Sequence, residues 1–403
     1  MAALFPLVVL RLKLTPLDDA DAYWHILSGQ EVWRDHVFAG PDSLSRFTGR
    51  PWVKLDWLTD VAMAAAHHVG GFAAVSWLFA VAGVAVFVSL WVLCRDRAGV
   101  LVATLVAVAA WIGTTASQSQ RPQTLSFILL AVTLTVWLRV ARDPSRRPPW
   151  WLVPLSWVWA SCHGLWFMGP MVGVVVVVGM ALDRTHPLSR LVAFAAVPVL
   201  EVVAAGVTPV GPQLLTQPFV VSGYAPLITE WQSPDIHEPY VAVTLGLIGL
   251  TALGWARATD RVRWVDVLLW GVALVWAVLY ARTVALGAVV VAPVAAAALQ
   301  GVVGAAREAV VRLERVVLGG AAVGAVVLAT VIAPVVAPRP VGMPTGLGAA
   351  VDALPRGTVV FNAEAVGGWL MLEHPGVETV VDTRNHLFAM DYVHRYVAAR
   401  AAT

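Results

Sequence analysis

Three carboxylates lie within four residues near the start of the chain, at Asp18, Asp19 and Asp21. They directly follow an apolar segment, and carboxylates at such a boundary lose hydration unless a cation, a basic partner or a substrate proton compensates. All three are candidate catalytic residues. Asp19 and Asp21 form a D-x-D pair, which suits Mg²⁺ or Mn²⁺ held against a phosphate, or a general base acting on a hydroxyl. A group of solvated helix caps explains the same spacing equally well.

Further polar residues stand alone between long apolar segments. Arg121 lies between Gln120 and Pro122, where its paired N–H groups can bind a lipid phosphate or its side chain can reach toward the membrane surface. His163 adjoins Gly164 and is a candidate for substrate binding or proton relay, or else a packing residue.

A later polar region contains Glu230 and Trp231. Glu230 is a candidate contact to an acceptor or a metal, and Trp231 can stack on a sugar ring. The competing interpretation is a loop anchor with tryptophan at the membrane interface. Glu201 falls inside an apolar segment, where an acid indicates a polar pathway or a shared cavity.

The composition predicts a membrane protein. Of 403 residues, 59% are hydrophobic and 13% are charged, and the mean hydropathy is +0.75. Soluble domains average about 25% charged residues, so lipid must solvate much of this chain. The net charge of +2 gives no reason to expect nucleic-acid binding. Cys94 and Cys162 lack metal-ligand or C-x-x-C spacing and are expected to be free thiols, and motifs of nucleotide-binding P-loops, serine hydrolases and zinc proteases are absent.

The apolar segments predict an all-α polytopic protein with about eleven transmembrane helices. An interruption by Pro154, Gly164, Gly169 and Pro170 leaves open that the fifth and sixth segments form one kinked element. The expected spans are residues 2–17, 71–94, 99–116, 122–140, 150–163, 165–182, 191–207, 239–256, 264–280, 283–300 and 316–336.

Arginines in alternate loops predict the orientation. With the N-terminus in the cytoplasm, every second short loop carries at least two arginines, whereas the opposite short loops carry only Arg121 and Arg282. The arginines expected in the cytoplasm are Arg95, Arg97, Arg139, Arg142, Arg146, Arg147, Arg184, Arg190, Arg257, Arg261, Arg263, Arg307, Arg312 and Arg315.

This topology divides the chain into a transmembrane domain, 1–336, and an extracytoplasmic domain, 337–403. Outer loops are expected at 17–70, ending in an interfacial helix over 57–69, and at 208–240. The pattern of residues 358–362, 364–372 and 378–382 predicts strand, helix and strand. We therefore expect a small α/β domain that is incomplete, in a chain truncated at its termini.

The first outer loop resembles that of bacterial GT-C integral-membrane glycosyltransferases of the dolichyl-phosphate-mannose mannosyltransferase-like kind. Tyr23 stands where that family usually has Trp, and Leu44 where it has Phe. The resemblance rests on Asp19, Asp21, Tyr23, Trp24, His25, Gly29, Pro41, Asp42, Ser43, Leu44, Ser45, Gly49, Pro51, Trp52, Trp57 and Leu58, then on 120–123, 163–164, 230–234, 361–362, 367–370, Asp382 and Arg384.

The resemblance implies transfer of a sugar from a polyprenyl-phosphate carrier to a glycan, lipid or protein acceptor of the cell envelope, on the outer face of a bacterial plasma membrane. It implies that an acid of the first outer loop is essential, at Asp19 or Asp21 and less readily Asp18, and it places His25 in the substrate-binding motif. Two alternatives stay open: a transporter or flippase, for which no convincing internal repeat is found, and an inactive scaffold that keeps the fold.

Overall fold

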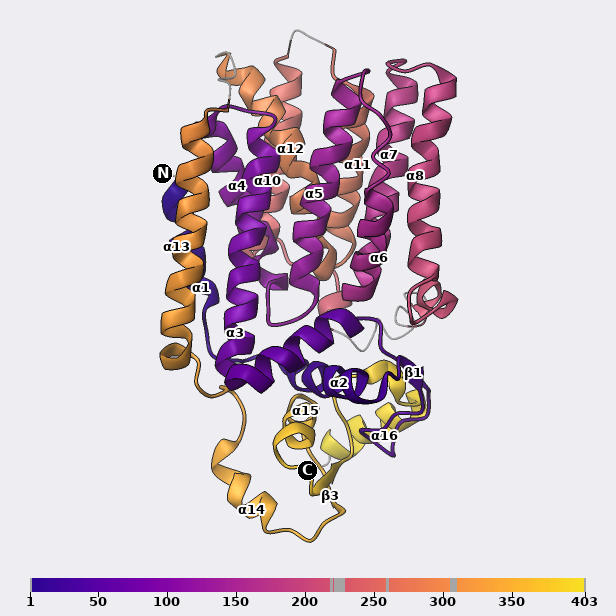
Figure 1. Cartoon of the computed structure of the whole chain (residues 1–403), viewed down its shortest axis with the longest axis vertical. Coiled ribbons are helices and arrows are strands. Elements are labelled where there is room, and N and C mark those ends of the chain that lie inside the picture. Colours follow the sequence, from indigo (N-terminus) through magenta and orange to yellow (C-terminus); the bar gives the residue numbers. More distant parts are fainter. Residues whose placement is uncertain (1, 218–219, 221–228, 259–260, 305–309, 402–403) are drawn as a thin grey trace.

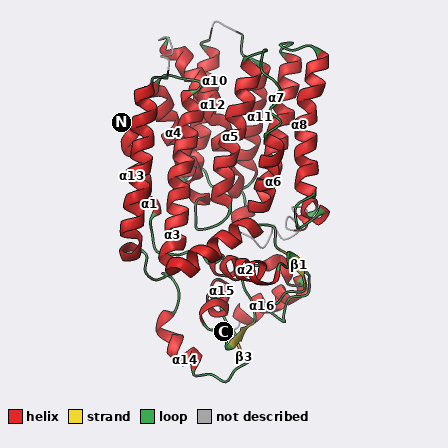
Figure 2. Ribbon diagram, viewed as in Figure 1, coloured by secondary structure: helices red, strands yellow, loops and turns green. Residues whose placement is uncertain are grey.

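The computed structural model describes residues 2–217, 220, 229–258, 261–304 and 310–401. It is a helical bundle with a small α/β region at one end (Figures 1 and 2). The bundle contains α1 (Phe5–Lys13), α3 (Trp57–Arg95), α4 (Val100–Thr114), α5 (Gln123–Arg142), α6 (Leu152–Cys162), α7 (Met168–Leu182), α8 (Leu188–Gly206), α10 (Pro239–Ala256), α11 (Trp264–Leu279), α12 (Val284–Val303) and α13 (Arg312–Val336).

Eight helices in the described part of the chain are long and apolar enough to cross a membrane, which makes the chain a multi-pass integral membrane protein. The expected count of eleven was too high by this criterion, since α1 has 9 residues, α6 has 11 and α11 has 16. α1 ends before its expected limit at residue 17, because Pro16 disfavours helix at Thr15. α6 and α11 end within one residue of their expected limits, where His163 and Tyr280 adopt extended backbone.

α3 contains the predicted boundary between an interfacial helix and a span. Gly70 and Gly71 have non-helical dihedrals, and Gly71 has a φ of +60° with a ψ of −151°, a combination open to glycine. The helix therefore changes direction at 70–71. Its first part lies across the end of the bundle beside α2 (Ala22–Asp35), and its second part runs along the bundle (Figure 1).

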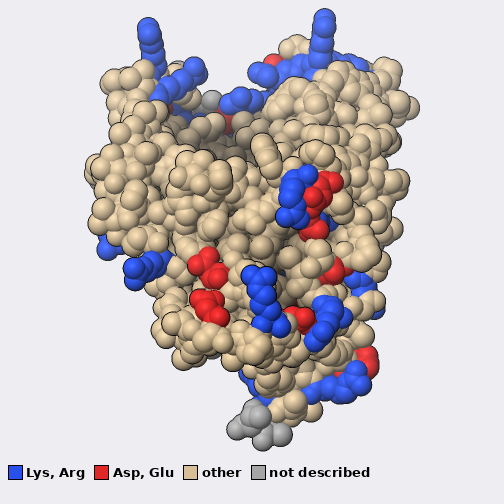
Figure 3. Space-filling model, turned by 60° about the horizontal axis from the view of Figure 1, so that its bottom comes forward, with Lys and Arg blue, Asp and Glu red and all other residues tan. Residues whose placement is uncertain are grey.

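The two ends of the bundle differ in charge. The arginine-rich loops lie at the end opposite α2, and Figure 3 shows basic side chains along the upper rim and mixed acids and bases on the lower end. Buried ion pairs tie these loops together, as Arg95 binds Glu314 and Arg97 binds Asp266. Arg307 lies outside the described residues. The separation of charge agrees with the predicted alternation of loops, and the side of the membrane that each end faces stays a prediction.

The chain after α13 forms the small α/β region. β3 (Thr358–Val360) pairs in parallel with β4 (Val377–Thr379), and α15 (Glu364–Glu373) connects them, which confirms the predicted strand, helix and strand. Two further helices, α14 (Gly348–Asp352) and α16 (Met390–Ala401), flank this unit. In the first outer loop, β1 (Ala39–Gly40) pairs antiparallel with β2 (Trp52–Val53).

Candidate functional site

A close crossing of α2 and α3 positions the first polar cluster. A Cβ atom on Gly29 would lie 1.9 Å from the carbonyl oxygen of Asp60, so only glycine permits this approach. The approach brings the buried Asp60 carboxylate to 2.6 Å from His25 Nδ1, and the Ser28 hydroxyl donates to its other oxygen at 2.6 Å. His25 is 3% exposed, so protein encloses its imidazole, which links α2 to α3 through Asp60.

Asp19 and Asp21 form a fixed turn just before α2. The backbone N–H of Asp21 donates to Asp19 Oδ1 at 2.9 Å, and the Trp24 indole N–H reaches Asp21 Oδ1 at 3.3 Å and the Thr383 hydroxyl at 3.0 Å. Asp19 is buried, whereas the Asp21 side chain is 16% exposed. Asp21 is therefore the more accessible of the two. Asp18 is exposed on the surface beside them.

One guanidinium joins these acids to the second outer loop. Arg121 Nε lies 2.7 and 2.6 Å from the two carboxylate oxygens of Asp19 and 3.2 Å from Asp21 Oδ2. Its Nη1 lies 2.9 Å from Glu230 Oε1. Four of the residues singled out from the sequence therefore meet at one point, although they come from three separate segments.

Backbone contacts hold Arg121 in that place. The neighbouring Gln120 amide donates to the Thr15 hydroxyl at 3.3 Å and to the Pro16 carbonyl at 3.4 Å. Lys13 donates to the carbonyl of Gln118 at 2.9 Å. The segment before Asp19 and the segment before Arg121 are thus tied together next to the ion pair.

The cluster keeps Asp21 and Arg121 charged. Burial alone would raise the pKa of Asp21, but Arg121 and a hydrogen bond from Thr383 hold that pKa below its usual range. Burial would lower the pKa of Arg121, but Asp21, Asp19 and Glu230 raise it above that of a free arginine. Asp21 is therefore a carboxylate at neutral pH.

A second arginine, Arg282, faces the same cluster. Its guanidinium lies 5.9 Å from the centre of the Trp231 ring, and its charge interacts with Glu230, Arg121, Asp56 and Asp21. Among the described residues it has neither a hydrogen bond nor an ion pair. Trp231 packs on Tyr280 at 5.5 Å between ring centres, and the backbone N–H of Ala281 donates to Gln232 at 2.9 Å. The charged groups around Arg282 come from distant segments, so its sequence neighbours do not reveal them.

His163 lies behind the cluster and is buried. Its Nδ1 accepts a hydrogen bond from the backbone of Leu165 at 3.3 Å and lies 3.0 Å from the Ser126 hydroxyl. Ser126 in turn accepts from the Trp159 indole at 2.9 Å. These contacts fix the ring between α5, α6 and α7, and substrate binding by His163 stays a prediction.

Asp56 is a functional candidate to which the sequence analysis gave no role. It precedes α3, and its Oδ1 atom is buried without a hydrogen-bond partner in the described structure. Burial raises the pKa of Asp56 to about 7, with His25 acting in the opposite direction. The adjacent Trp57-Leu58 motif was the available signal, but the burial of Asp56 depends on tertiary packing.

The C-terminal region forms one wall of the site. Arg384 is fully buried and binds Asp382 at 2.7 Å and also Asp42 of the first outer loop at 2.9 Å. Its guanidinium lies 4.5 Å from the centre of the Trp52 ring. Burial and Arg384 lower the pKa of the nearby His386 to about 4, so this imidazole is neutral. The C-terminal region therefore contacts the first outer loop through an ion pair between residues that lie far apart in the sequence.

Arg121 lies at the position among Asp19 and Asp21 that a divalent metal held by them would take. Both Asp19 oxygens and one oxygen of Asp21 already face Arg121, and a cation in their midst would meet its positive charge. In the described part of the chain, no group of three or more His, Cys, Asp or Glu side chains is arranged to hold a metal ion. The expected Mg²⁺ or Mn²⁺ at Asp19 and Asp21 stays a prediction.

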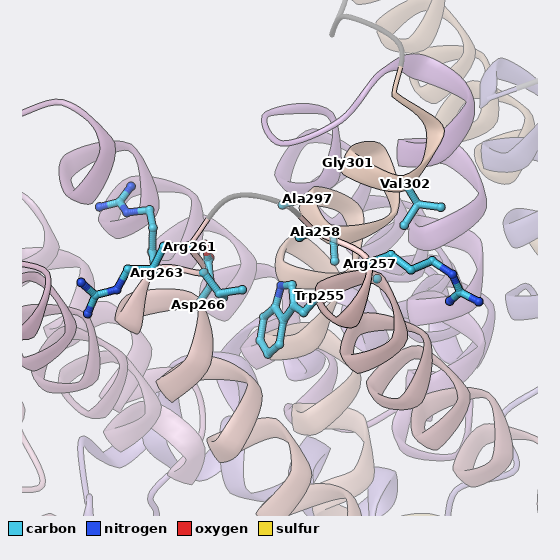
Figure 4. A pocket seen from close by; sticks show the side chains of 12 residues that line it. Trp255, Arg257, Ala258, Arg261, Arg263, Asp266, Ala297, Gly301 and Val302 are labelled. Atoms are coloured by element: carbon cyan, nitrogen blue, oxygen red, sulfur yellow. The ribbon is translucent and has the colours of Figure 1, made fainter.

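Two other features lie away from the cluster. Glu201 is buried in α8 beside Gly169 and Trp159, with Oε2 lacking a partner in the described structure. A cavity of about 410 Å³ lies at the arginine-rich end between α10, α11 and α12 (Figure 4). Its lining includes Arg257 and Arg261, so it provides a contrasting basic site at the opposite end of the bundle.

Comparison with solved structures identifies the fold. The chain is similar to the Archaeoglobus fulgidus oligosaccharyltransferase solved with Zn and sulfate, at 11% identity and a TM-score of 0.57, covering 95% of this chain and 62% of that one. It is also similar to the oligosaccharyltransferase AglB of that organism in complex with an inhibitory peptide and a dolichol-phosphate, at 10% identity and a TM-score of 0.60, covering 95% and 64%.

These likenesses show a GT-C-like fold, and this chain spans about 62–64% of the length of the two structures. No protein-family model matches the sequence. No curated protein matches it either.

Proposed function

We propose that this protein transfers a sugar from a polyprenyl-phosphate carrier to an acceptor of the cell envelope, on the side of the membrane that its C-terminal region faces. The observation that carries the proposal is the convergence of Asp19, Asp21, Arg121, Glu230 and Arg282 where two outer loops meet the bundle. A related fold solved with a dolichol-phosphate supports a lipid-linked donor.

The position of the cluster suits a lipid substrate. It lies at the end of the apolar helices, where a polyprenyl tail stays in the bilayer and its phosphate reaches polar side chains. The C-terminal region covers the same end of the bundle (Figure 1). With the predicted orientation, this end lies outside the cytoplasm.

Asp21 is our candidate to orient and deprotonate the acceptor. It is ionised and partly exposed, whereas Asp19 is buried and saturated by Arg121 and the Asp21 backbone. The acceptor lone pair forms a bond to the anomeric carbon as the bond from that carbon to the phosphate oxygen breaks. The electron pair leaves with the phosphate, and the acceptor proton passes to the carboxylate.

Arg282 is our candidate to bind the leaving phosphate. Arg121 already donates to Asp19 and Glu230, whereas the donors of Arg282 are unused among the described residues. A planar guanidinium binds phosphate through two parallel hydrogen bonds and stabilises the charge that develops on departure. We propose Trp231 and Glu230 as contacts for the sugar beside it.

The proposal is tested by transfer from radiolabelled polyprenyl-phosphate sugars in proteoliposomes. We expect Asp21→Asn to lower transfer by about 100-fold or more, the range for removal of a positioned acid or base. Arg282→Ala is expected to lower it similarly by loss of charge stabilisation. Undiminished transfer in both variants would contradict the proposal.

Asp35→Asn is the matched control for the aspartate variant. Asp35 ends α2, is exposed, and contacts Arg34 at 2.7 Å, so its change alters charge in the same loop without touching the cluster. It should retain wild-type transfer. Donor binding without turnover in the wild type would instead indicate the inactive scaffold.

A further inference from the structure

The arrangement around Arg121 has the charge pattern of a cation site. Carboxylates of Asp19, Asp21 and Glu230 lie 2.6, 3.2 and 2.9 Å from its nitrogen atoms. They come from the first and second outer loops, and the arginine comes from the short loop before α5. Three carboxylates this close repel one another strongly unless a positive charge lies between them.

Hydrogen bonds hold the two aspartates in the orientation in which they face Arg121. The Asp21 backbone N–H and the Trp24 indole hold the two aspartates, and Gln120 anchors the backbone next to Arg121. Arg121 is only 29% exposed at its side chain. The backbone beside Arg121 is therefore held in place, and the guanidinium lies among carboxylates that are themselves hydrogen-bonded.

Oxygen ligands from several carboxylates are also what Mg²⁺ and Mn²⁺ prefer. A divalent ion and the guanidinium cannot share the centre of this cluster, because both are cations and both need the same oxygens. Arginine stays protonated at every physiological pH, so its charge does not dissociate from the protein.

We propose that the guanidinium of Arg121 is the permanent cation of this cluster, in place of a dissociable divalent ion, and that its removal raises the affinity of Asp19, Asp21 and Glu230 for divalent cations. The first half deepens the proposed function, since it makes sugar transfer independent of added metal. The gain of divalent-cation affinity on removal of Arg121 rests on the cluster alone and does not depend on the proposed function.

Mn²⁺ binding tests this without any transfer assay. The purified full-length chain in nanodiscs is titrated with Mn²⁺, and free Mn²⁺ is followed by electron paramagnetic resonance. We expect little binding by the wild type and by Arg121→Lys, which keeps a positive charge. Arg121→Ala should bind one Mn²⁺ per chain at least ~10-fold more tightly than the wild type.

Two further variants locate the site and check the fold. Arg121→Ala combined with Asp19→Asn should lose the new Mn²⁺ affinity, which assigns it to the cluster. Arg34→Ala, at an exposed ion pair with Asp35, should bind like the wild type. Arg121→Gln replaces Arg121→Ala if the alanine variant does not fold.

Tight stoichiometric Mn²⁺ binding by the wild type that Asp19→Asn abolishes would overturn the proposal. A folded Arg121→Ala or Arg121→Gln chain that gains no Mn²⁺ affinity would also overturn it. Transfer that survives EDTA supports the permanent cation. If no transfer is detected at all, the proposed function fails while the Mn²⁺ result stands.

Discussion

The Nε atom of Arg121 lies 2.6 Å from Oδ2 of Asp19, joining residues 102 positions apart across the end of the bundle. This contact fixes the first outer loop against the start of α5. Because Asp19 is buried, Arg121 takes the place of the water that an exposed carboxylate would contact.

Breaking the pair from one side should cost more than removing both charges. We expect Asp19→Asn and Arg121→Ala each to lower the midpoint of thermal unfolding, because each leaves a charge without its partner, an effect of about 3–5 kcal/mol for buried pairs and less here because Arg121 is partly exposed. The double variant should lower the midpoint by less than the sum of the two single effects. If the effects of the two substitutions on unfolding of the detergent-solubilised protein were strictly additive, the two residues would not interact.

Gly29→Ala should separate α2 from α3. Its Cβ atom would lie 1.9 Å from the Asp60 carbonyl oxygen, so the helices must move apart and His25 loses its short contact to Asp60. Overpacking of this kind costs about 1–3 kcal/mol or more.

Differential scanning fluorimetry of Gly29→Ala against Gly246→Ala provides the measurement. Gly246 lies in α10 with open space around its Cβ position, so alanine there should be neutral or slightly stabilising through helix propensity. Equal midpoints for the two variants would contradict the close crossing.

Asp56→Asn should change stability in a pH-dependent way. Burial raises the pKa of Asp56 from 3.8 to about 7, so folding favours its neutral form. That contribution is complete below the unfolded pKa and is lost as the pH rises through about 7. Asparagine stays neutral at every pH.

We therefore expect the thermal midpoint of Asp56→Asn to exceed that of the wild type by more near about pH 8.5 than near about pH 5. The exposed Asp35→Asn serves as control, with a difference from wild type that stays flat over this range. A pH-independent difference for Asp56→Asn would show that Asp56 is ionised throughout.

Arg384→Ala should loosen the C-terminal region from the first outer loop. It leaves Asp42 and Asp382 buried without their cation, and removal of one partner from a buried pair costs about 3–5 kcal/mol. Hydrogen exchange should rise both around 382–388 and around 41–53. Arg395→Ala, at an exposed i,i+4 pair with Asp391, should leave exchange unchanged.

The helices and the two ends of the bundle follow from local signals. Apolar stretches predicted α3 to α5 closely, and arginines in alternate loops predicted which loops share an end. α6 and α11 lie where the apolar stretches predicted them, but with 11 and 16 residues they are shorter than the eight helices that can cross a membrane by length. α1, expected over 2–17, covers only Phe5–Lys13.

The sequence indicated residues of the candidate site by their type, but it did not predict which of them contact one another. Asp19, Asp21, Arg121 and Glu230 stood out as polar groups in outer loops, but their pairing depends on how three segments pack. Asp60 was missed, since one acid in the first turn of a helix has no distinctive pattern. Its role appears only when Gly29 brings α2 against it.

The most direct test of the account is an electron cryomicroscopy structure of the protein with a bound polyprenyl phosphate. The account predicts phosphate density within hydrogen-bond reach of Arg282, with Asp21 open toward the attached sugar position. Phosphate density in the cavity lined by Arg257 and Arg261, at the opposite end of the bundle, would contradict it.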